Sequence, residues 1–384
     1  MPFRHMLIRL VVFVAVSHLF FSAHAGEQTD IVLGQSAPLS GSFSEMGETY
    51  RDGAQIYFEK INKEGGVNGR RIRLITLDDG YDAKRAQVNT KELIEQHQAL
   101  ALFGHMFTNT VFASLPLATA AGVPYVGPYA GNETLYAGPV NHILFMTRAS
   151  YSTELDALLR HVQAMGLTRV ALARYDSPGG AILQKDLEEK LKAIKLAPVG
   201  VATMQLNSTQ PADVVLKIIK MHPQAILLGV SGDDAVAFVR QFNQSADKFP
   251  VQFLARSLIG GHQLVVKLGS ESRGIVISQV APSPFNGETH IAREYQAALK
   301  AANAAGRKLV ASYIGFDGYI AAKVMVEGLR RAGPNPGRPA LVKALETMHH
   351  WDAGDFIVDY DENNHTGSKF VTVTVIGAGG HYIE

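Results

Sequence analysis

The chain has 384 residues, of which 47% are hydrophobic and 18% charged. This balance favours folded domains with large apolar cores and argues against a disordered chain. The 36 basic residues nearly match the 35 acidic ones, so a net charge of +1 offers no basic excess for nucleic acid or an anionic membrane. Cysteine is absent, which excludes disulfides, thiolate metal ligands and cysteine nucleophiles.

Residues 1–25 have the pattern of a secretory signal peptide. Arg4 and Arg9 precede an apolar run, and Ala23-His24-Ala25 supplies the small residues of a cleavage site. As an uncleaved anchor the run would lie near the lower length limit for a membrane span. We therefore expect cleavage, which leaves 34 basic against 35 acidic residues and a net charge of −1. An exported chain without cysteine, and with no later segment apolar enough to span a bilayer, fits the bacterial periplasm.

Apolar runs of strand length alternate with amphipathic helical stretches through most of the chain. In the first half we expect strands at 31–34, 72–77, 100–104, 124–127 and 143–146, with helices at 54–61, 83–95 and 108–121 between them. In the second half we expect strands at 170–173, 199–204, 225–229, 251–254 and 274–278, with helices at 152–165, 182–194, 212–221 and 234–242. Near-continuous apolar strands separated by helices predict α/β lobes with doubly wound parallel sheets.

The C-terminal segment departs from this alternation. Helices are expected at 290–302, 313–331 and 340–348, with a stiff glycine- and proline-rich linker at 333–337. Residues 356–360 and 370–376 are expected to pair as a hairpin. A segment this short cannot form a third domain, so we expect it to complete the first two.

Motifs for catalysis, metal binding or cofactor binding are weak. The glycines around Ser231 lack the spacing of a nucleophile elbow, and residues 359–363 lack the glycine and glutamate of a calcium loop. No P-loop or G-x-G-x-x-G motif occurs. We therefore expect no enzyme activity, no metal site and no cofactor.

Several ordered motifs carry a resemblance to a known family. They are Gly34 to Gly41, Gly53 to Gly66, Asn68 to Arg71, Asp78-Asp79, Phe103 to His105, Gly122 to Pro124 and Gly315 to Ala322. Together they resemble the leucine/isoleucine/valine-binding proteins, which are type I periplasmic solute-binding proteins of ABC transporters. The resemblance implies two α/β lobes joined by a hinge of three crossings, with a ligand cleft between them.

The resemblance also sets expectations for organisation and function. It implies a first lobe of residues 26–147 plus 281–335 and a second of 148–280 plus 336–384. It implies a monomeric importer component that binds a branched-chain amino acid or a related amino acid or organic acid by hinge closure and delivers it to ABC permease subunits. A ligand sensor of the same fold that acts in signalling is the alternative. No nucleic-acid partner is expected.

In the first lobe, the resemblance points to two loops that would hold a ligand carboxylate. Phe107 and Thr108 lie where the family places a carboxylate-binding hydroxyl, although Thr108 could equally be a plain helix N-cap. The second loop contributes Tyr129, Ala130 and Gly131. The small residues Ala130 and Gly131 would let the backbone approach a ligand closely, although the loop could also be an ordinary turn.

Three further residues are expected near the ligand. Ser40 and Met46 flank a loop similar in position to one that lines the side-chain pocket, although Met46 could be core filler. Tyr151 follows the first crossing and could face the cleft or pack on the surface.

The second lobe departs from the family pattern. An aromatic residue is replaced near Ser231, and Arg256-Ser257 offers no carboxylate where the family pairs one with the ligand ammonium. Either Asp233 or Asp317 supplies that charge, or the ligand lacks an ammonium group. Arg256 could instead meet a second carboxylate in the bidentate geometry that arginine favours, or form a surface salt bridge.

Overall fold

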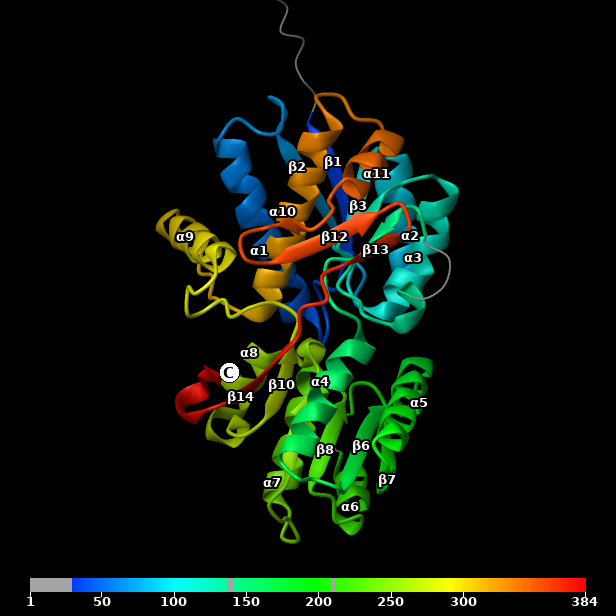
Figure 1. Cartoon of the computed structure of the whole chain (residues 1–384), viewed down its shortest axis with the longest axis vertical. Coiled ribbons are helices and arrows are strands. Elements are labelled where there is room, and N and C mark those ends of the chain that lie inside the picture. Colours follow the sequence, from blue (N-terminus) through cyan, green and yellow to red (C-terminus); the bar gives the residue numbers. More distant parts are fainter. Residues whose placement is uncertain (1–29, 137–140, 209–210) are drawn as a thin grey trace, which may run out of the picture.

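The computed structural model describes residues 30–136, 141–208 and 211–384, so the expected signal peptide lies outside the described residues. The chain forms two α/β lobes, one above the other in Figure 1. Each lobe is built on a parallel sheet, and the predicted doubly wound architecture is confirmed.

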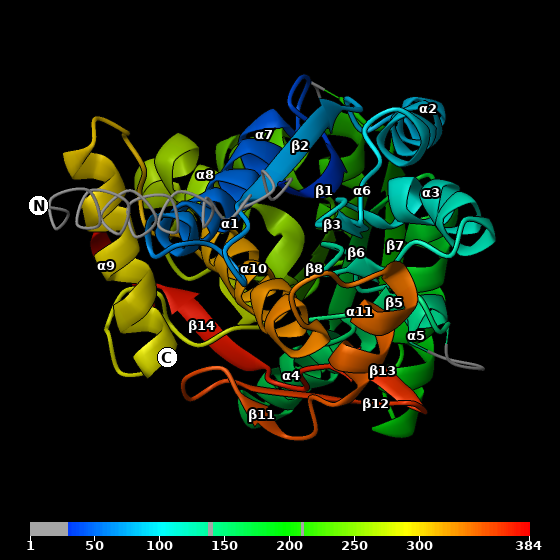
Figure 2. The same ribbon diagram turned by 90° about the horizontal axis from the view of Figure 1, so that it is seen from above.

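The first lobe contains a five-stranded parallel sheet in the order β2-β1-β3-β4-β5. Its strands are β1 (Ile31–Ala37), β2 (Ile72–Asp78), β3 (Ala101–Phe103), β4 (Tyr125–Val126) and β5 (Leu144–Phe145). Helices cover both faces (Figure 2). On one side lie α2 (Ala83–Glu95) and α3 (Thr108–Ala120), and on the other α1 (Ser44–Lys63), α9 (His290–Ala304), α10 (Tyr313–Ala332) and α11 (Arg338–Glu346). Both faces of the strands are therefore buried, which explains their near-continuous apolar sequences.

The second lobe contains a seven-stranded sheet in the order β15-β14-β10-β9-β8-β6-β7. Five strands are parallel, namely β6 (Val170–Tyr175), β7 (Gly200–Met204), β8 (Ala225–Gly229), β9 (Gln252–Ala255) and β10 (Val276–Gln279). The strands β14 (Thr372–Ile376) and β15 (Tyr382–Ile383) add antiparallel to this edge. One face packs against α4 (Tyr151–Ala164) and α5 (Pro178–Ala193), and the other against α6 (Ala212–Lys220), α7 (Gly232–Gln244) and α8 (Gly261–Leu268).

Both lobes share one topology. The first lobe runs β2-β1-β3-β4-β5, and the five parallel strands of the second run β7-β6-β8-β9-β10 in the same pattern. In sheets of this order, the chain leaves in opposite directions from the first and third strands, which opens a crevice at their carboxyl ends. The crevices lie beside β1/β3 in one lobe and β6/β8 in the other.

The C-terminal segment corrects two expectations. Residues 338–367 pack on the first lobe, where Leu341 and Leu345 of α11 join its core, and only β14 and β15 enter the second sheet (Figure 1). The third crossing therefore lies between 367 and 372, not at 335. The expected hairpin partner also differs, because β12 (Ile357–Asp361) pairs with β13 (Asn364–Gly367) and β11 (Trp351–Asp352).

Residues 360–365 stay with the first lobe because they are hydrogen-bonded to the chain just after β5. The hydroxyl of Tyr360 donates to the Met146 carbonyl at 2.6 Å, and the Met146 N–H donates to the His365 carbonyl at 2.9 Å. Strand alternation shows that 356–360 and 370–376 are strands, but it does not reveal the partner of either strand.

Candidate functional site

A cavity lies between the lobes at the carboxyl ends of both sheets. It encloses about 840 Å³, part of which opens to solvent, a size typical of small-molecule sites. We call it the interlobe cleft. The first-lobe residues that line it come after the ends of β1, β2, β3 and β4, and the second-lobe residues lie at or after the ends of β5, β6, β8 and β9. The lining residues are Phe43, Tyr81, Phe107, Thr108, Asn109, Asn132, Glu133, Tyr151, Ser152, Tyr175, Ser177, Gly179, Gly180, Ile182, Leu183, Asp186, Gly229, Ser231, Arg256 and Leu258. The topological switch points of the two sheets, beside β1/β3 and β6/β8, therefore open onto the same cavity.

Three aromatic side chains form the first-lobe wall. The ring centroids of Phe43 and Tyr81 lie 4.7 Å apart, those of Phe43 and Phe107 4.9 Å, and those of Tyr81 and Phe107 5.2 Å. Tyr81 and Phe107 have positive φ angles of 65° and 68°. Residues other than glycine rarely adopt this backbone conformation, because it costs of the order of 1–3 kcal/mol. Where it occurs, it is concentrated at functional sites.

Thr108 lies beside this wall as the first residue of α3. The N-cap is Phe107, and no side chain caps the helix, so Thr108 is not the N-cap considered above. Among the described residues, no hydrogen bond from the Thr108 hydroxyl is formed. The helix start therefore presents unpaired N–H groups, the positive end of its dipole and a hydroxyl to the cleft.

The second-lobe wall is built around an arginine. The guanidinium carbon of Arg256 lies 4.5 Å from the ring centroid of Tyr151, which begins α4. Nearby, the hydroxyl of Tyr175 donates to Asp234 at 2.9 Å and accepts from the Ser231 N–H at 3.2 Å. The start of α7 has no side-chain cap either. Both lobes thus bring donors to the cleft.

Two carboxylates also line the cleft, and both hold the first turn of α4. Glu133 accepts from the Ser152 N–H at 2.7 Å, and Asp186 accepts from the Ser152 hydroxyl at 3.1 Å. Lys190 lies 3.9 Å from Asp186. Burial raises the pKa of Asp186 above its ordinary value.

A buried ionic cluster joins the lobes behind the cleft. Arg148 lies at the first crossing and is 2% exposed. Its guanidinium lies 3.2 Å from Glu154 in the second lobe and 3.7 Å from Asp317 in the first. It donates to the Ser257 hydroxyl and lies 4.4 Å from the Tyr129 ring centroid. Burial raises the pKa of Asp317 to about 7, although Arg148 opposes the shift.

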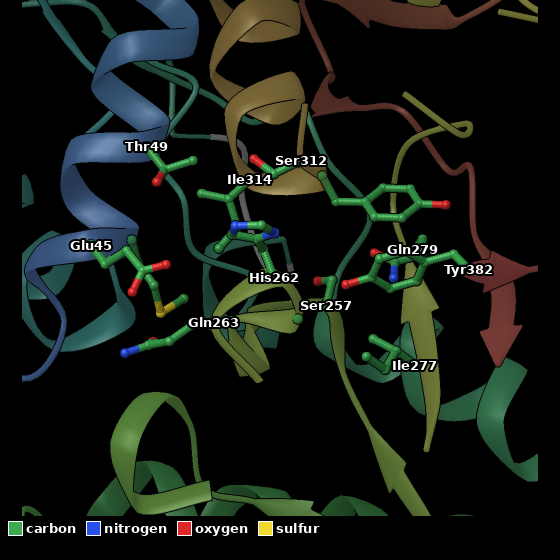
Figure 3. A pocket seen from close by; sticks show the side chains of 14 residues that line it. Glu45, Thr49, Ser257, His262, Gln263, Ile277, Gln279, Ser312, Ile314 and Tyr382 are labelled. Atoms are coloured by element: carbon green, nitrogen blue, oxygen red, sulfur yellow. The ribbon is translucent and has the colours of Figure 1, made fainter. Parts of the chain in front are cut away.

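A second pocket between the lobes is smaller. In Figure 3, side chains from α1, α10, α8 and β10 converge on it, among them Glu45, Thr49, His262, Ser312 and Gln279. Met46 and Ser257 also line it. The side-chain carbonyl of Gln263 is buried there without a hydrogen bond within the described chain.

The residues predicted from sequence fall into three groups. Those lining the interlobe cleft are Phe107, Thr108, Tyr151, Ser231 and Arg256. Those lining the second pocket are Met46 and Ser257. The rest line neither: Ser40 donates to Asp78 at 2.6 Å, Tyr129 lies under Arg148, Ala130 is fully buried, Gly131 packs on the Tyr151 ring, Asp233 pairs with Lys267, and Asp317 pairs with Arg148.

Several cleft residues escaped the sequence analysis. Phe43 and Tyr81 follow strands of the first lobe and Tyr175 is the last residue of β6, and this position at a strand end is the one signal that could have found them. Glu133 and Asp186 lie on helices, where an exposed carboxylate is the ordinary interpretation.

Within residues 30–136, 141–208 and 211–384, no helix has the length and apolar character to cross a membrane. Over the same residues, no group of three or more His, Asp or Glu side chains is arranged to hold a metal ion.

Comparison with known proteins completes the picture. A family model described as periplasmic binding protein matches residues 30–381. A Leu/Ile/Val-binding protein homolog 8 from Brucella abortus is 23% identical over 95% of this chain and 92% of its own length. A Pseudomonas aeruginosa amino acid binding protein is 32% identical, but the match spans only 31% of this chain and 32% of that protein.

A solved structure agrees with the sequence comparisons. A substrate-binding periplasmic protein from Ralstonia solanacearum is 31% identical and superposes with a TM-score of 0.86 over 92% of this chain and 99% of that one. The two-lobe fold, the shared switch points and these matches agree, and the chain belongs to the periplasmic binding protein family.

Proposed function

We propose that this protein is the periplasmic solute-binding subunit of an ABC importer. It captures a small carboxylate-bearing solute, a branched-chain amino acid or a related amino acid or organic acid, in the interlobe cleft. The observation that carries the proposal is that the switch points of both sheets open onto one cavity. Such a cavity holds a ligand that touches both lobes at once.

The first lobe supplies the groups for a carboxylate. The start of α3 offers N–H donors without a side-chain cap, and Thr108 adds a hydroxyl. An anion is stabilised at a helix N-terminus by these donors and by the helix dipole. The aromatic wall of Phe43, Tyr81 and Phe107 receives the apolar part of the solute.

Closure of the lobes supplies the mechanism. The solute binds one lobe first, and the other lobe then closes on it. The closed state is favoured only by the contacts that the solute makes there and not in the open state. At the mouth of the cleft, the hydroxyl of Ser42 donates to the side-chain carbonyl of Asn207 in the opposite lobe at 2.6 Å. Nothing is chemically transformed, and the permease subunits recognise the closed lobes.

The test is a ligand screen followed by delivery. Purified mature protein is screened by thermal shift against aliphatic amino acids, aromatic acids and dicarboxylates. A ligand at 100 times its dissociation constant adds about 2.7 kcal/mol of stability. Hits are confirmed by calorimetry and by recovery of the unchanged solute. Delivery is then measured into vesicles carrying the partner permease and ATPase.

The outcomes separate the candidate functions. Binding, unchanged recovery and ATP-dependent uptake support the proposal. Binding without uptake points to a sensor, whereas chemical conversion of the solute or failure of the whole panel to bind contradicts the proposal.

A further inference from the structure

Arg256 is a cation that faces the cleft without a counterion. It follows β9 and precedes the short helix η2 (Ser257–Ile259), which directs its side chain into the interlobe cleft. Its planar guanidinium lies 4.5 Å from the ring centroid of Tyr151. Among the described residues the guanidinium of Arg256 makes no hydrogen bond and no ion pair. This cation–π contact with Tyr151 leaves the guanidinium N–H donors for another group.

The nearest carboxylates are occupied by other partners. Glu154 bonds Arg148 and accepts from the Ser257 N–H at 2.7 Å. Asp186 accepts from Ser152 and lies near Lys190. Both act on Arg256 only at a distance, and burial, the largest influence, lowers its pKa from the ordinary value. Arg256 is half-buried, and a half-buried cation without a protein partner is incompletely solvated, so a ligand that supplies an anion here gains from the pairing.

The two carboxylates considered from the sequence as partners of a ligand ammonium do not line this cleft. Asp233, one of the two carboxylates considered from the sequence, pairs with Lys267 and accepts from Gln263 at 3.0 Å, outside the cleft lining. Asp317, the other, pairs with Arg148 behind the cleft. The carboxylates that do line the cleft, Glu133 and Asp186, accept hydrogen bonds from Ser152 at the start of α4. The second-lobe wall therefore presents an unpaired cation at Arg256, whereas an α-amino-acid clamp requires a free carboxylate.

We propose that Arg256 is a specificity-determining residue that binds a second acidic group of the solute, so that the ligand class is a dicarboxylate. This inference rests on the proposed function and deepens it. One carboxylate binds at Thr108 and the start of α3 in the first lobe, and the other pairs with Arg256 in the second. A diacid then bridges the lobes by charge at both ends, while its carbon skeleton contacts the aromatic wall of Phe43, Tyr81 and Phe107.

Calorimetry on the intact mature protein tests this assignment. The probes are glutarate, adipate and the three benzenedicarboxylates, each compared with its half-amide, together with leucine, isoleucine and valine. We expect at least one diacid to bind at least tenfold more tightly than its half-amide and than the three amino acids. This comparison needs only the wild-type chain.

Variants then locate the effect. Arg256→Gln should weaken diacid binding at least tenfold and bring the diacid and its half-amide to similar affinities. Arg256→Lys, which keeps the charge but loses the planar fork, should fall between Arg256→Gln and wild type. Arg160→Gln, on an exposed arginine of α4 in the same lobe, should bind as wild type does.

Three results would overturn the inference: no diacid binds, the half-amide binds as well as the diacid, or Arg256→Gln keeps the wild-type affinity. Tight binding of leucine, isoleucine or valine without diacid binding would reject this inference and leave the proposed function standing. Failure of every carboxylate tested would reject both.

Discussion

Arg148 and Asp317 form an ion pair across the boundary between the lobes, with 3.7 Å between the guanidinium and the carboxylate. The same guanidinium lies 3.2 Å from Glu154, which is fully buried in the second lobe. The Ser278 hydroxyl donates to Glu154 at 2.7 Å from β10. One side chain at the first crossing thus connects α10 of the first lobe with α4 and β10 of the second.

Removal of Arg148 should therefore destabilise the whole fold. Arg148→Met leaves Glu154 buried without its cation, and breaking a buried pair in this way costs about 3–5 kcal/mol. Denaturant unfolding followed by circular dichroism measures the loss. Arg160→Met, at an exposed position of α4, should change the unfolding free energy by no more than about 0.5 kcal/mol. A loss below about 1 kcal/mol for Arg148→Met would show that water or other groups solvate Glu154.

The pKa of Asp317 predicts a pH dependence of stability. Burial raises this pKa to about 7 from 3.8, so the folded state binds a proton more tightly than the unfolded state. The Asp317 contribution is therefore fully present below about pH 4 and is lost as the pH rises to about 7. A shift of this size corresponds to at most about 4 kcal/mol.

The comparison of wild type with Asp317→Asn isolates that contribution. The unfolding free energy of the variant relative to wild type should rise between pH 4 and pH 7 and stay constant above that range. Asp247→Asn, at an exposed carboxylate of the second lobe, is the matched control. If the difference for Asp317→Asn does not change with pH, the raised pKa is contradicted.

Binding should depend on the Thr108 hydroxyl. Thr108→Ala removes the hydroxyl at the start of α3 and leaves a ligand acceptor without its donor, which costs about 1–3 kcal/mol. Calorimetry with any ligand identified in the screen measures the loss. Thr108→Ser keeps the hydroxyl and should keep most of the affinity. An unchanged affinity in Thr108→Ala would remove this residue from the site.

The contact between Ser42 and Asn207 should slow ligand release. It joins the lobes at the mouth of the cleft, and a hydrogen bond of this kind contributes about 0.5–1.5 kcal/mol. Ser42→Ala should therefore raise the dissociation rate about two- to tenfold, measured by stopped-flow fluorescence, with little change in thermal stability. Ser44→Ala, two residues along at the start of α1, should leave that rate unchanged. Equal rates for both variants would indicate that this bond does not hold the closed state.

The sequence predicted much of the fold because local pattern and burial agree there. Strands such as Val170–Tyr175 are covered on both faces, so their apolar runs are unambiguous. Pairing at the C-terminus was missed, because alternation in residues 356–376 marks strands without marking their partners. The family resemblance placed Thr108 and Arg256 at the cleft, since both follow strand ends.

The other site features depend on tertiary contacts that the sequence does not encode locally. The pairing of Arg148 with Asp317 joins residues far apart in the chain, and Arg148 is part of no sequence motif that would indicate it. The left-handed conformation of Phe107, which turns its ring toward Phe43 and Tyr81, is likewise set by the surrounding structure. The sequence leaves Asp233 and Asp317 as possible partners of a ligand ammonium. In the structure Asp233 pairs with Lys267 and Asp317 pairs with Arg148.

Ligand binding should require Gly131, because Gly131 packs against the Tyr151 ring on which the Arg256 guanidinium lies. A Cβ added at Gly131 would lie 2.4 Å from a ring carbon of Tyr151, so Gly131→Ala must displace that ring. Because the guanidinium of Arg256 stacks on Tyr151, the displacement should lower ligand affinity at least tenfold, as calorimetry would measure. Gly179→Ala is the matched control, since Gly179 also lines the cleft but a Cβ there meets no atom within 4 Å. Loss of affinity in Gly179→Ala but not in Gly131→Ala would place the ligand against α5 rather than beside Tyr151 and Arg256.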